Sequence, residues 1–184
     1  MQLRKIWWAI GLLLKRPFFK NVGKYSYMGP VTCLHGTKGI SIGNRVRIYP
    51  GARMETHDSG EIIIGHDCSI AQNFHVTSGK NKLVIGDKTT ISGNVFITNI
   101  DHEYQNVDEH IMDQPMIYKE TIIGENCFIG YGAAIQAGTI LGKQCIVGTN
   151  AVVRGTFPDY SVIVGVPAKV VKHYDEEAGA WIRD

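Results

Sequence analysis

Aliphatic residues recur at every sixth position over a long stretch of the chain. The residues that open successive blocks are Ile123, Ile129, Ile135, Leu141, Val147 and Val153. A small residue follows four places after the opener, as at Cys127 and Ala133. A period of six is neither the 3.6-residue period of a helix nor the two-residue alternation of a half-buried strand. Because it continues without a slip, this pattern predicts a repeat architecture.

Each six-residue block predicts a short strand followed by a sharp corner. Three blocks would close a triangular coil, and successive coils would stack at the spacing of hydrogen-bonded strands, roughly 4.8 Å. The aliphatic opener would point into this prism, and the small residue would fit its narrow interior. Glycine or asparagine at the corner would ease the bend, because both tolerate a positive φ. Parallel stacking would also pair backbone N–H and C=O groups between coils.

The same phase runs through the earlier part of the chain. Five coils with three openers each can be written as Ile42, Ile48, Met54; Ile64, Ile70, Val76; Ile85, Ile91, Ile97; Ile123, Ile129, Ile135; and Leu141, Val147, Val153. Glycines follow the first opener of every coil, at Gly43, Gly65, Gly86, Gly124 and Gly142. We therefore expect an all-β parallel solenoid of about five to six coils.

The periodicity divides the chain into three parts. Residues 1–24 form an apolar and basic helical segment, residues 25–166 form the solenoid with a polar loop inserted at 103–122, and residues 167–184 form a C-terminal cap that includes a helix. A loop of this length in a compact domain is usually functional. The N-terminal segment has two interpretations. One is a helix packed on the prism or on a neighbouring subunit, and the other is peripheral contact of residues 4–19 with a membrane surface.

Composition narrows the function classes. The net charge of +2 over 184 residues argues against a nucleic-acid-binding protein. Three of the four cysteines, Cys68, Cys127 and Cys145, share one inward phase, which favours buried small hydrophobic residues. No Cys-x-x-Cys spacing suggests zinc or redox chemistry. Free thiols fit a reducing compartment, so we expect a cytoplasmic protein, at the inner face of the membrane if the N-terminal segment binds lipid.

Three motifs carry a family resemblance beyond the repeat itself. They are Thr-Asn-Ile-Asp-His-Glu-Tyr at 98–104, Asp-Gln-Pro at 113–115 and Gly-Val-Pro-Ala-Lys at 165–169. With the repeat over about residues 25–173, they make the chain resemble the hexapeptide-repeat acyltransferases, and among these the sugar and polysaccharide O-acetyltransferases. The resemblance implies a left-handed parallel β-helix, acetyl-CoA as co-substrate with no metal, a saccharide acceptor, and a homotrimer with active sites between subunits.

Acetyl transfer from a thioester to a hydroxyl needs a base, a donor to the oxyanion and a site that holds both substrates. Histidine is the side chain whose pKa lies near neutrality without tuning. Among seven histidines, His102 is six residues into the face opened by Ile97, at a corner where the chain leaves the prism for the 103–122 loop. A rigid coil would therefore position this side chain while the loop forms a wall. The resemblance also assigns the catalytic base to this position.

The resemblance implies further site residues by position. An oxyanion-stabilising backbone N–H would lie near Tyr131. Residues expected to bind the coenzyme are Gly130, Tyr131, Gly132, Thr149, Arg154, Lys169 and Lys172. Residues expected to bind the acceptor are Asn73, His75, Asn99, Asp101, Tyr104, Gln114 and Phe128. Asp101 or Glu103 could orient the imidazole of His102.

Three other functions remain open on the sequence. One is an acyltransferase of the same fold that acts on an amino sugar or an antibiotic. Another is a zinc-dependent γ-type carbonic anhydrase, which needs three converging histidines, for which His75, His102 and His110 are the candidates. The last is a scaffold without catalytic activity. The sequence leaves open which sugar and which hydroxyl would be modified.

Overall fold

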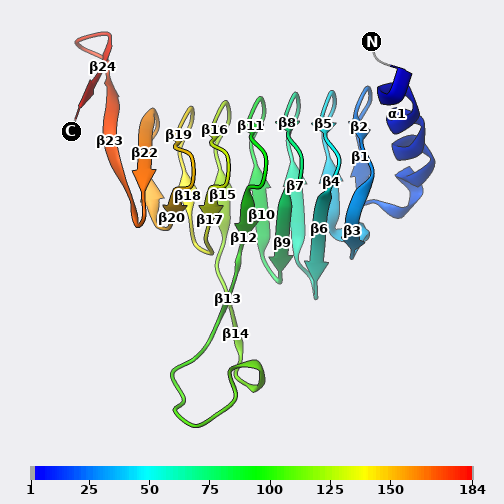
Figure 1. Ribbon diagram of the computed structural model, residues 1–184, viewed down its shortest axis with the longest axis horizontal. Helices are drawn as coiled ribbons and strands as arrows, with labels where there is room; N and C mark the ends of the chain where they lie inside the picture. Colours follow the sequence, from blue (N-terminus) through cyan, green and yellow to red (C-terminus); the bar gives the residue numbers. More distant parts are fainter. Residues whose placement is uncertain (1–2, 184) are drawn as a thin grey trace.

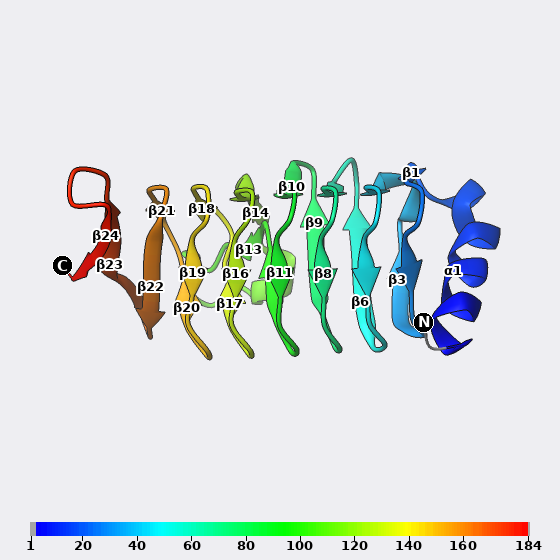
Figure 2. The ribbon, with the colours of Figure 1, turned by 90° about the horizontal axis from the view of Figure 1, so that it is seen from above.

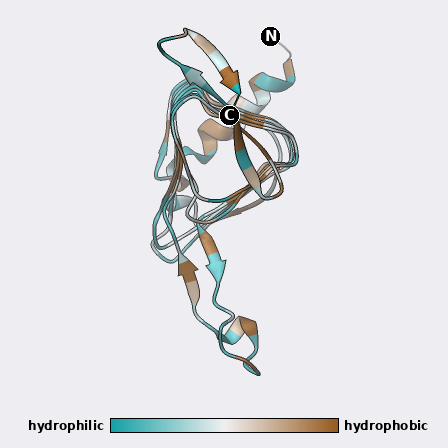
Figure 3. Ribbon diagram, turned by 90° about the vertical axis from the view of Figure 1, so that its left-hand side faces the viewer, coloured by the Kyte–Doolittle hydropathy of each residue, from teal (hydrophilic) through white to brown (hydrophobic). Residues whose placement is uncertain are grey.

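The computed structural model describes residues 3–183 as a row of short strands stacked along one axis, with a helix across the N-terminal end (Figure 1). The helix α1 (Leu3–Lys15) leads through the 3-10 turn η1 (Arg16–Phe18) into the first coil. Seen along the axis, the stack is a three-sided prism (Figure 3), and each side is one parallel sheet. The parallel β-helix expected from the sequence is confirmed.

Each sheet takes one strand from every coil. The first contains, in order, β1 (Asn21–Val22), β4 (Ile40–Ile42), β7 (Glu61–Ile64), β10 (Lys82–Ile85), β15 (Thr121–Ile123), β18 (Ile140–Leu141) and β21 (Thr156–Phe157). The second contains β2 (Tyr27–Met28), β5 (Arg47–Ile48), β8 (Ser69–Ile70), β11 (Thr90–Ile91), β16 (Phe128–Ile129), β19 (Ile146–Val147), β22 (Ser161–Gly165), β23 (Ala168–Asp175) and β24 (Ala180–Arg183). The third contains β3 (Val31–His35), β6 (Ala52–His57), β9 (His75–Gly79), β12 (Phe96–Thr98), β17 (Ala134–Ile135) and β20 (Val152–Val153). The turn η2 (Thr37–Gly39) precedes β4.

The core is a set of aliphatic ladders that run along the inside of the prism. On the first sheet, Ile42, Ile64, Ile85, Ile123 and Leu141 stand directly beside one another in adjacent strands. All fifteen predicted openers are buried, none of them more than 1% exposed. The repeat therefore specifies the register, because a slip of one residue would turn every opener outward.

The corner glycines act differently from the expectation. Gly43, Gly65 and Gly124 are absent from the positive-φ positions, which fall two residues later, for example at Arg45 and Asn126. A Cβ at Gly43 would lie 2.5 Å from the carbonyl oxygen of Gly65, in the next coil. The coils stack so closely at this corner that no side chain fits. Glycine is required there for contact between backbones rather than for its freedom in φ.

Replacing Gly124 with alanine is expected to destabilise the fold by about 1–3 kcal/mol, the cost of overpacking a site that cannot yield. The new Cβ would lie 2.4 Å from the carbonyl oxygen of Gly142, which is backbone and cannot rotate away. Gly11→Ala is the matched control, because its Cβ would meet nothing within 4 Å in helix α1. That change is expected to stabilise by about 1 kcal/mol. Urea unfolding midpoints measure both, and equal midpoints would contradict the stacking argument.

The C-terminal cap is made of strands, so the helix expected within residues 167–184 is wrong. Strand β23 turns back antiparallel against β22, and β24 pairs antiparallel with β23. The apolar run from 162 to 171 is rich in valine, which favours strand over helix. Antiparallel pairing hides the edge of the last parallel strand, which is what a cap of a solenoid must do.

The chain departs from the solenoid after β12. Strand β13 (Ile100–His102) leads outward, η3 (Ile111–Asp113) lies near the tip, and β14 (Met116–Tyr118) returns antiparallel to β13. This two-stranded ribbon and its loop project from one edge of the prism (Figures 1 and 3). The insertion expected at 103–122 therefore begins two or three residues earlier, with a regular ribbon at its base. At the other end, β1 lies inside the 1–24 segment that was expected to precede the solenoid.

Candidate active site

A groove of about 650 Å³ lies between the outer face of the third sheet and the β13–β14 ribbon. Strands β6, β9 and β12 of three successive coils form its floor. The lining residues are Arg53, Glu55, His57, Asp58, His75, Thr77, Phe96, Thr98, Ile100, His102, Met116 and Tyr118. Charged, hydroxyl-bearing and aromatic side chains thus converge where the chain leaves the solenoid.

The solenoid register builds the floor of the groove. Arg53, His75 and Phe96 are directly beside one another in neighbouring strands, each one place before an inward-facing aliphatic residue. Since side chains alternate along a strand, all three point outward. The rings of His75 and Phe96 meet edge to face, with centroids 5.0 Å apart and planes at 61°. The Nε2 atom of His75 lies 3.2 Å from the hydroxyl of Thr77.

His102 is the last residue of β13 and is paired with Met116 on the returning strand. Its ring is partly buried and lines the groove. The Nδ1 atom is buried without a hydrogen-bond partner within the described chain. A buried polar atom is normally paired, so an unpaired one beside a groove is unusual and is typical of a functional site. The ribbon therefore fixes the position of the imidazole, while its Nδ1 atom makes no hydrogen bond within the described chain.

Charges on the floor of the groove change the protonation of its side chains. Burial lowers the pKa of His75, and the nearby Arg53 guanidinium lowers it further. Arg53 itself binds Glu55 through two hydrogen bonds of 2.8 and 3.2 Å, which lower the pKa of that carboxyl. His75 is therefore biased toward the neutral form, and Glu55 is held as a carboxylate.

Tyr118 closes the groove from the ribbon side. Its hydroxyl donates a 3.2 Å hydrogen bond to Asp58, and the ammonium of Lys80 lies 4.8 Å from its ring centroid. Burial raises the pKa of the Tyr118 hydroxyl, so this group stays protonated and can donate. The ring of Tyr118 also lies against the Cα of Gly79, where a Cβ would come within 2.4 Å of it. The ribbon is thus tied to loops of two preceding coils.

Two residues expected to bind the acceptor are instead structural. Asn99 is fully buried, accepts a hydrogen bond from the Gly79 N–H and donates to Ser78 Oγ and the Asn81 carbonyl. Gln114 is 4% exposed, and its amide bonds to backbone groups of the inserted loop. Both amides use their polar atoms inside the protein, so the expectation for Asn99 and Gln114 is corrected.

Of the other residues expected to bind the acceptor, some line the groove and others lie outside it. His75 lines the groove with His102, whereas Asn73 lies at a solenoid corner and bonds Asn94. Tyr104 and Phe128 are exposed outside the groove lining.

Asp101 and Arg154, expected to bind acceptor and coenzyme respectively, form an ion pair of 3.1 Å with each other. The second carboxylate oxygen of Asp101 accepts the backbone N–H of His102 at 3.1 Å. The pair therefore supports the backbone that carries His102, from the solenoid strand that precedes Arg154.

Residues expected to contact the coenzyme lie at a different corner of the prism. Gly130, Tyr131 and Gly132 form the turn between the second and third sheets, stacked on the turn that contains Thr149. The Gly130 N–H donates a hydrogen bond to the Val147 carbonyl, whereas the Tyr131 N–H has no hydrogen bond to any residue in 3–183. Tyr131 is about half exposed, and its hydroxyl accepts from the Asn94 amide. One backbone donor at this corner is thus available.

Lys169 and Lys172 lie on β23 and share a face. They differ by three positions, which would place them on opposite faces of a regular strand. A bulge between the β22–β23 pairs shifts the register, so that Lys169 lies beside Val164 and Lys172 beside Val162. Cross-strand partners lie on the same side of a sheet, and both valines flank the inward-facing Ile163. Both lysines therefore face outward at the C-terminal end, away from the groove lining.

The three histidines of the carbonic anhydrase alternative do not share one site in this chain. His75 and His102 line the groove, but His110 is in the inserted loop, where its Nδ1 accepts the Met112 N–H at 3.2 Å. No group of three or more potential metal ligands occurs within residues 3–183.

Sequence reasoning missed most of the groove wall. Arg53, Glu55 and Thr98 could have been found from the register, since they flank the inward Met54 and Ile97 on the coils around His102. Asp58 and Tyr118 carried no such signal, because the shape of two loops brings them together.

Comparisons with known proteins agree with this architecture. A family model described as "Hexapeptide repeat of succinyl-transferase" matches residues 120–154. The chain is 30% identical over 180 residues to the putative lipopolysaccharide biosynthesis O-acetyl transferase WbbJ of Escherichia coli strain K12, covering 92% of this chain and 88% of that protein. It is 29% identical over 166 residues to an Escherichia coli dTDP-4-amino-4,6-dideoxy-D-glucose acyltransferase, covering 86% and 84%.

Among solved structures, the chain is similar to AntD, an N-acyltransferase from Bacillus cereus crystallised with dTDP and 3-hydroxybutyryl-CoA. The TM-score is 0.77 at 21% identity, and the alignment covers 91% of this chain and 90% of that chain. The fold is shared over about nine-tenths of each chain. The repeat, the solenoid and the relatives together place the chain in the hexapeptide-repeat acyltransferase family, as an enzyme built on its left-handed parallel β-helix.

Proposed function

We propose that this enzyme transfers an acetyl group from acetyl-CoA to a hydroxyl of a saccharide, with His102 as the general base. The imidazole takes the hydroxyl proton as the oxygen attacks the thioester carbonyl. The tetrahedral intermediate then expels the thiolate of coenzyme A, which takes that proton from the imidazolium. The products are an acetyl ester and free coenzyme A, without an acyl-enzyme. A base of this kind is typically worth about 10²–10⁴ in rate.

The observation that carries the proposal is the uncommitted imidazole of His102 in a polar and aromatic groove. Its unpaired Nδ1 leaves the ring without an internal partner, and the groove volume of about 650 Å³ lies within the range of small-ligand sites. Sugars present hydroxyls and apolar ring faces, which suit the hydroxyl, carboxylate and aromatic groups around it. The relative WbbJ is named as an O-acetyl transferase, which supports an oxygen acceptor.

Coenzyme A would lie along the corner formed by Gly130, Tyr131 and Gly132, with Thr149 above it. The free Tyr131 N–H is suited to stabilise the oxyanion. Lys169 and Lys172 share one outward face and would attract the phosphates of the coenzyme. Arg154 is engaged with Asp101, and its role here is to support the strand of His102. The acyl-CoA in the AntD complex supports a thioester donor for this fold.

We further propose a homotrimer with active sites between subunits. Phe128 and Ile146 stand in register on the outer face of the second sheet and are exposed, which favours a covering neighbour. The acceptor would belong to cell-surface polysaccharide or lipopolysaccharide synthesis, with the enzyme in the cytoplasm or at the inner face of the membrane. Light scattering should give three times the chain mass.

The test is a thiol-release assay with acetyl-CoA and pairs of saccharide acceptors. The two members of a pair differ only in carrying a hydroxyl or an amine at one position. Each pair is offered as the free sugar, linked to a nucleotide and linked to a lipid. The expected result is thiol release that depends on a hydroxylated saccharide, with mass spectrometry showing an added acetyl ester. Transfer only to the amine of a pair would overturn oxygen as the acceptor and favour the amino-sugar alternative, which the second Escherichia coli relative supports. No transfer to any saccharide would overturn the proposal itself.

A further inference from the structure

Helix α1 carries an apolar face that points away from the solenoid. Six large hydrophobic side chains fall on one side of the helix, at spacings of three and four residues. Their exposures are 78% for Leu3, 38% for Ile6, 70% for Trp7, 42% for Ile10, 62% for Leu13 and 72% for Leu14. Phe18, just beyond the helix, is 64% exposed. Helix α1 lies across the outer end of the stack (Figures 1 and 2), where no further coil covers it.

The opposite face of α1 is firmly attached, so the outward face is held in a fixed orientation. Trp8 packs on Tyr27 and Tyr49, with ring centroids 6.1 and 6.3 Å away. Lys5 donates a 3.1 Å hydrogen bond to the Tyr49 hydroxyl, and Leu12 is 2% exposed against the first coil. The helix is therefore docked by one face and presents the other.

The same end of the molecule is strongly cationic. Residues 1–54 contain ten lysines and arginines and no aspartate or glutamate. Four of these cations, Lys20, Arg45, Arg47 and Arg53, pair with carboxylates of later residues. The other six have no carboxylate partner in the described chain and lie in α1, in η1 or in the first coil; they are Arg4, Lys5, Lys15, Arg16, Lys24 and Lys38. Two of them bind neutral oxygens, Lys5 the Tyr49 hydroxyl and Lys38 the Pro17 carbonyl.

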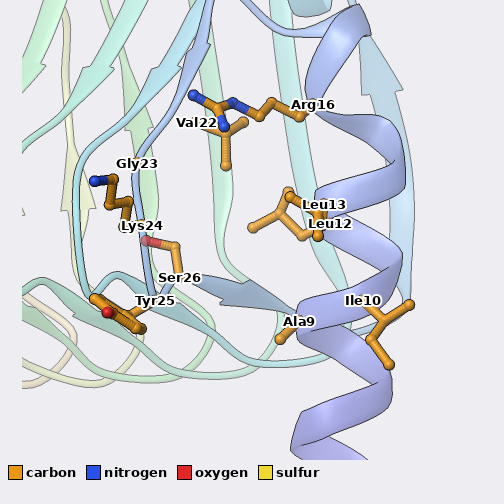
Figure 4. A pocket seen from close by; sticks show the side chains of 10 residues that line it. All are labelled: Ala9, Ile10, Leu12, Leu13, Arg16, Val22, Gly23, Lys24, Tyr25 and Ser26. Atoms are coloured by element: carbon orange, nitrogen blue, oxygen red, sulfur yellow. The ribbon is translucent and has the colours of Figure 1, made fainter.

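A groove of about 560 Å³ runs between α1 and the first coil, beside the apolar face (Figure 4). Leu12, Leu13 and Val22 give it an apolar lining. In Figure 4, Arg16 extends from the helix toward the first coil, on which Lys24 lies. An apolar groove with cations on its rim matches an acyl chain joined to a phosphate group.

We propose that the α1 end of the enzyme binds to the surface of an anionic phospholipid bilayer. Trp7 and the aliphatic side chains of α1 would enter the interface, where tryptophan is favoured, and the exposed cations Arg4, Lys15, Arg16 and Lys24 would reach the lipid phosphates. The helix lies in the plane of the membrane. At 13 residues it is shorter than the roughly 20 needed to cross one, and no described helix is long and apolar enough to do so.

Charge favours lipid over a second copy of the chain on this face. A symmetric contact between two α1 faces would bring the same cations of both copies together, because each patch meets its own equivalent. Like charges at an interface oppose association, whereas anionic lipid neutralises all of them at once. The direct consequence is that binding should need both anionic lipid and the apolar face.

Co-sedimentation with vesicles tests this proposal and requires no acyl transfer, so it stands apart from the proposed function. The full chain should bind vesicles of phosphatidylcholine with 30 mol% phosphatidylglycerol at least about tenfold more strongly than phosphatidylcholine alone, and less in high salt. Trp7→Glu with Leu14→Glu should reduce binding by about tenfold or more. Val166→Glu is the matched control, since Val166 is also 70% exposed but lies at the opposite end, and it should bind like the natural chain.

Light scattering without vesicles separates the alternatives. The Trp7→Glu, Leu14→Glu variant should keep the mass and the melting temperature of the natural chain. A drop in mass would overturn the proposal, because the face would then be a contact between subunits. Equal binding of the variant and the control to anionic vesicles, or no binding by the natural chain, would overturn it as well.

Discussion

His102→Ala is expected to lower kcat for acetyl transfer by about 10²–10⁴, with little change in KM for either substrate. This loss corresponds to roughly 3–5 kcal/mol of transition-state stabilisation. The expectation rests on the proposed role of the imidazole as the base, since a base acts as the bond to the acceptor forms and not before. An effect on kcat alone is the kinetic signature of an interaction made only in the transition state. Initial rates of thiol release over a range of acceptor concentrations measure both constants.

His66→Asn is the matched control for His102→Ala. His66 is exposed at a solenoid corner and is absent from the groove lining, and its Nδ1 accepts the Asn44 N–H at 2.9 Å. Asn44 makes the equivalent bond to Lys24 one coil earlier, so asparagine can replace His66 without losing the contact. This variant should keep full activity. If His102→Ala also stayed within about threefold of the natural rate, the role of general base would be refuted, and His75 would be the other histidine side chain in the groove able to act as a base.

The solenoid was predictable because its constraint is repeated in every coil. A single inward position tolerates many hydrophobic residues, but the ladder from Ile42 to Leu141 repeats one requirement five times. The glycines after the openers were visible too, although their cause was misassigned. Sequence shows that a side chain is missing at Gly43, but the close approach of the Gly65 backbone is a property of the stacked coils. The C-terminal cap has no repeat, and the helix expected there went against the valine-rich run from 162 to 171, which favours strand.

The sequence predicted only those residues of the site whose positions are set by the six-residue repeat. The phase of the third sheet places His75 on the groove floor and brings the chain to His102 at the departure point. Residue type alone was misleading for Asn99, because an amide in a polar motif can face a ligand or satisfy buried backbone groups. The ion pair of Asp101 with Arg154 joins positions 53 residues apart, and nothing in the local sequence links them. Contacts of this kind require the folded chain.

Asn99→Ala is expected to cost about 4 kcal/mol of folding free energy, because it removes three buried hydrogen bonds and leaves buried groups unpaired. The Gly79 N–H would lose its acceptor at 2.8 Å, and the Asn81 carbonyl and Ser78 hydroxyl would lose a donor. Asn99→Asp separates these contributions, since it keeps an acceptor for Gly79 but removes both donors. Asn99→Asp should also destabilise the fold, because burying a carboxylate removes it from water at a cost in free energy. Urea unfolding monitored by circular dichroism gives both values.

The effect of Asn99→Ala should extend to the ribbon that carries His102. Asn99 is the residue at which the chain leaves the third sheet, and its backbone carbonyl accepts the Lys119 N–H where the ribbon returns. Loosening this junction should speed amide hydrogen exchange in β13 and β14 more than in the distant strands of the first coil. Asn81→Ala is the matched control, because the Asn81 side chain is exposed and makes a single 3.4 Å contact with the Tyr118 carbonyl. It should cost less than about 1 kcal/mol. Equal exchange in both variants would mean that the ribbon is anchored by its own pairing, and that the buried amide of Asn99 does not hold the catalytic histidine in place.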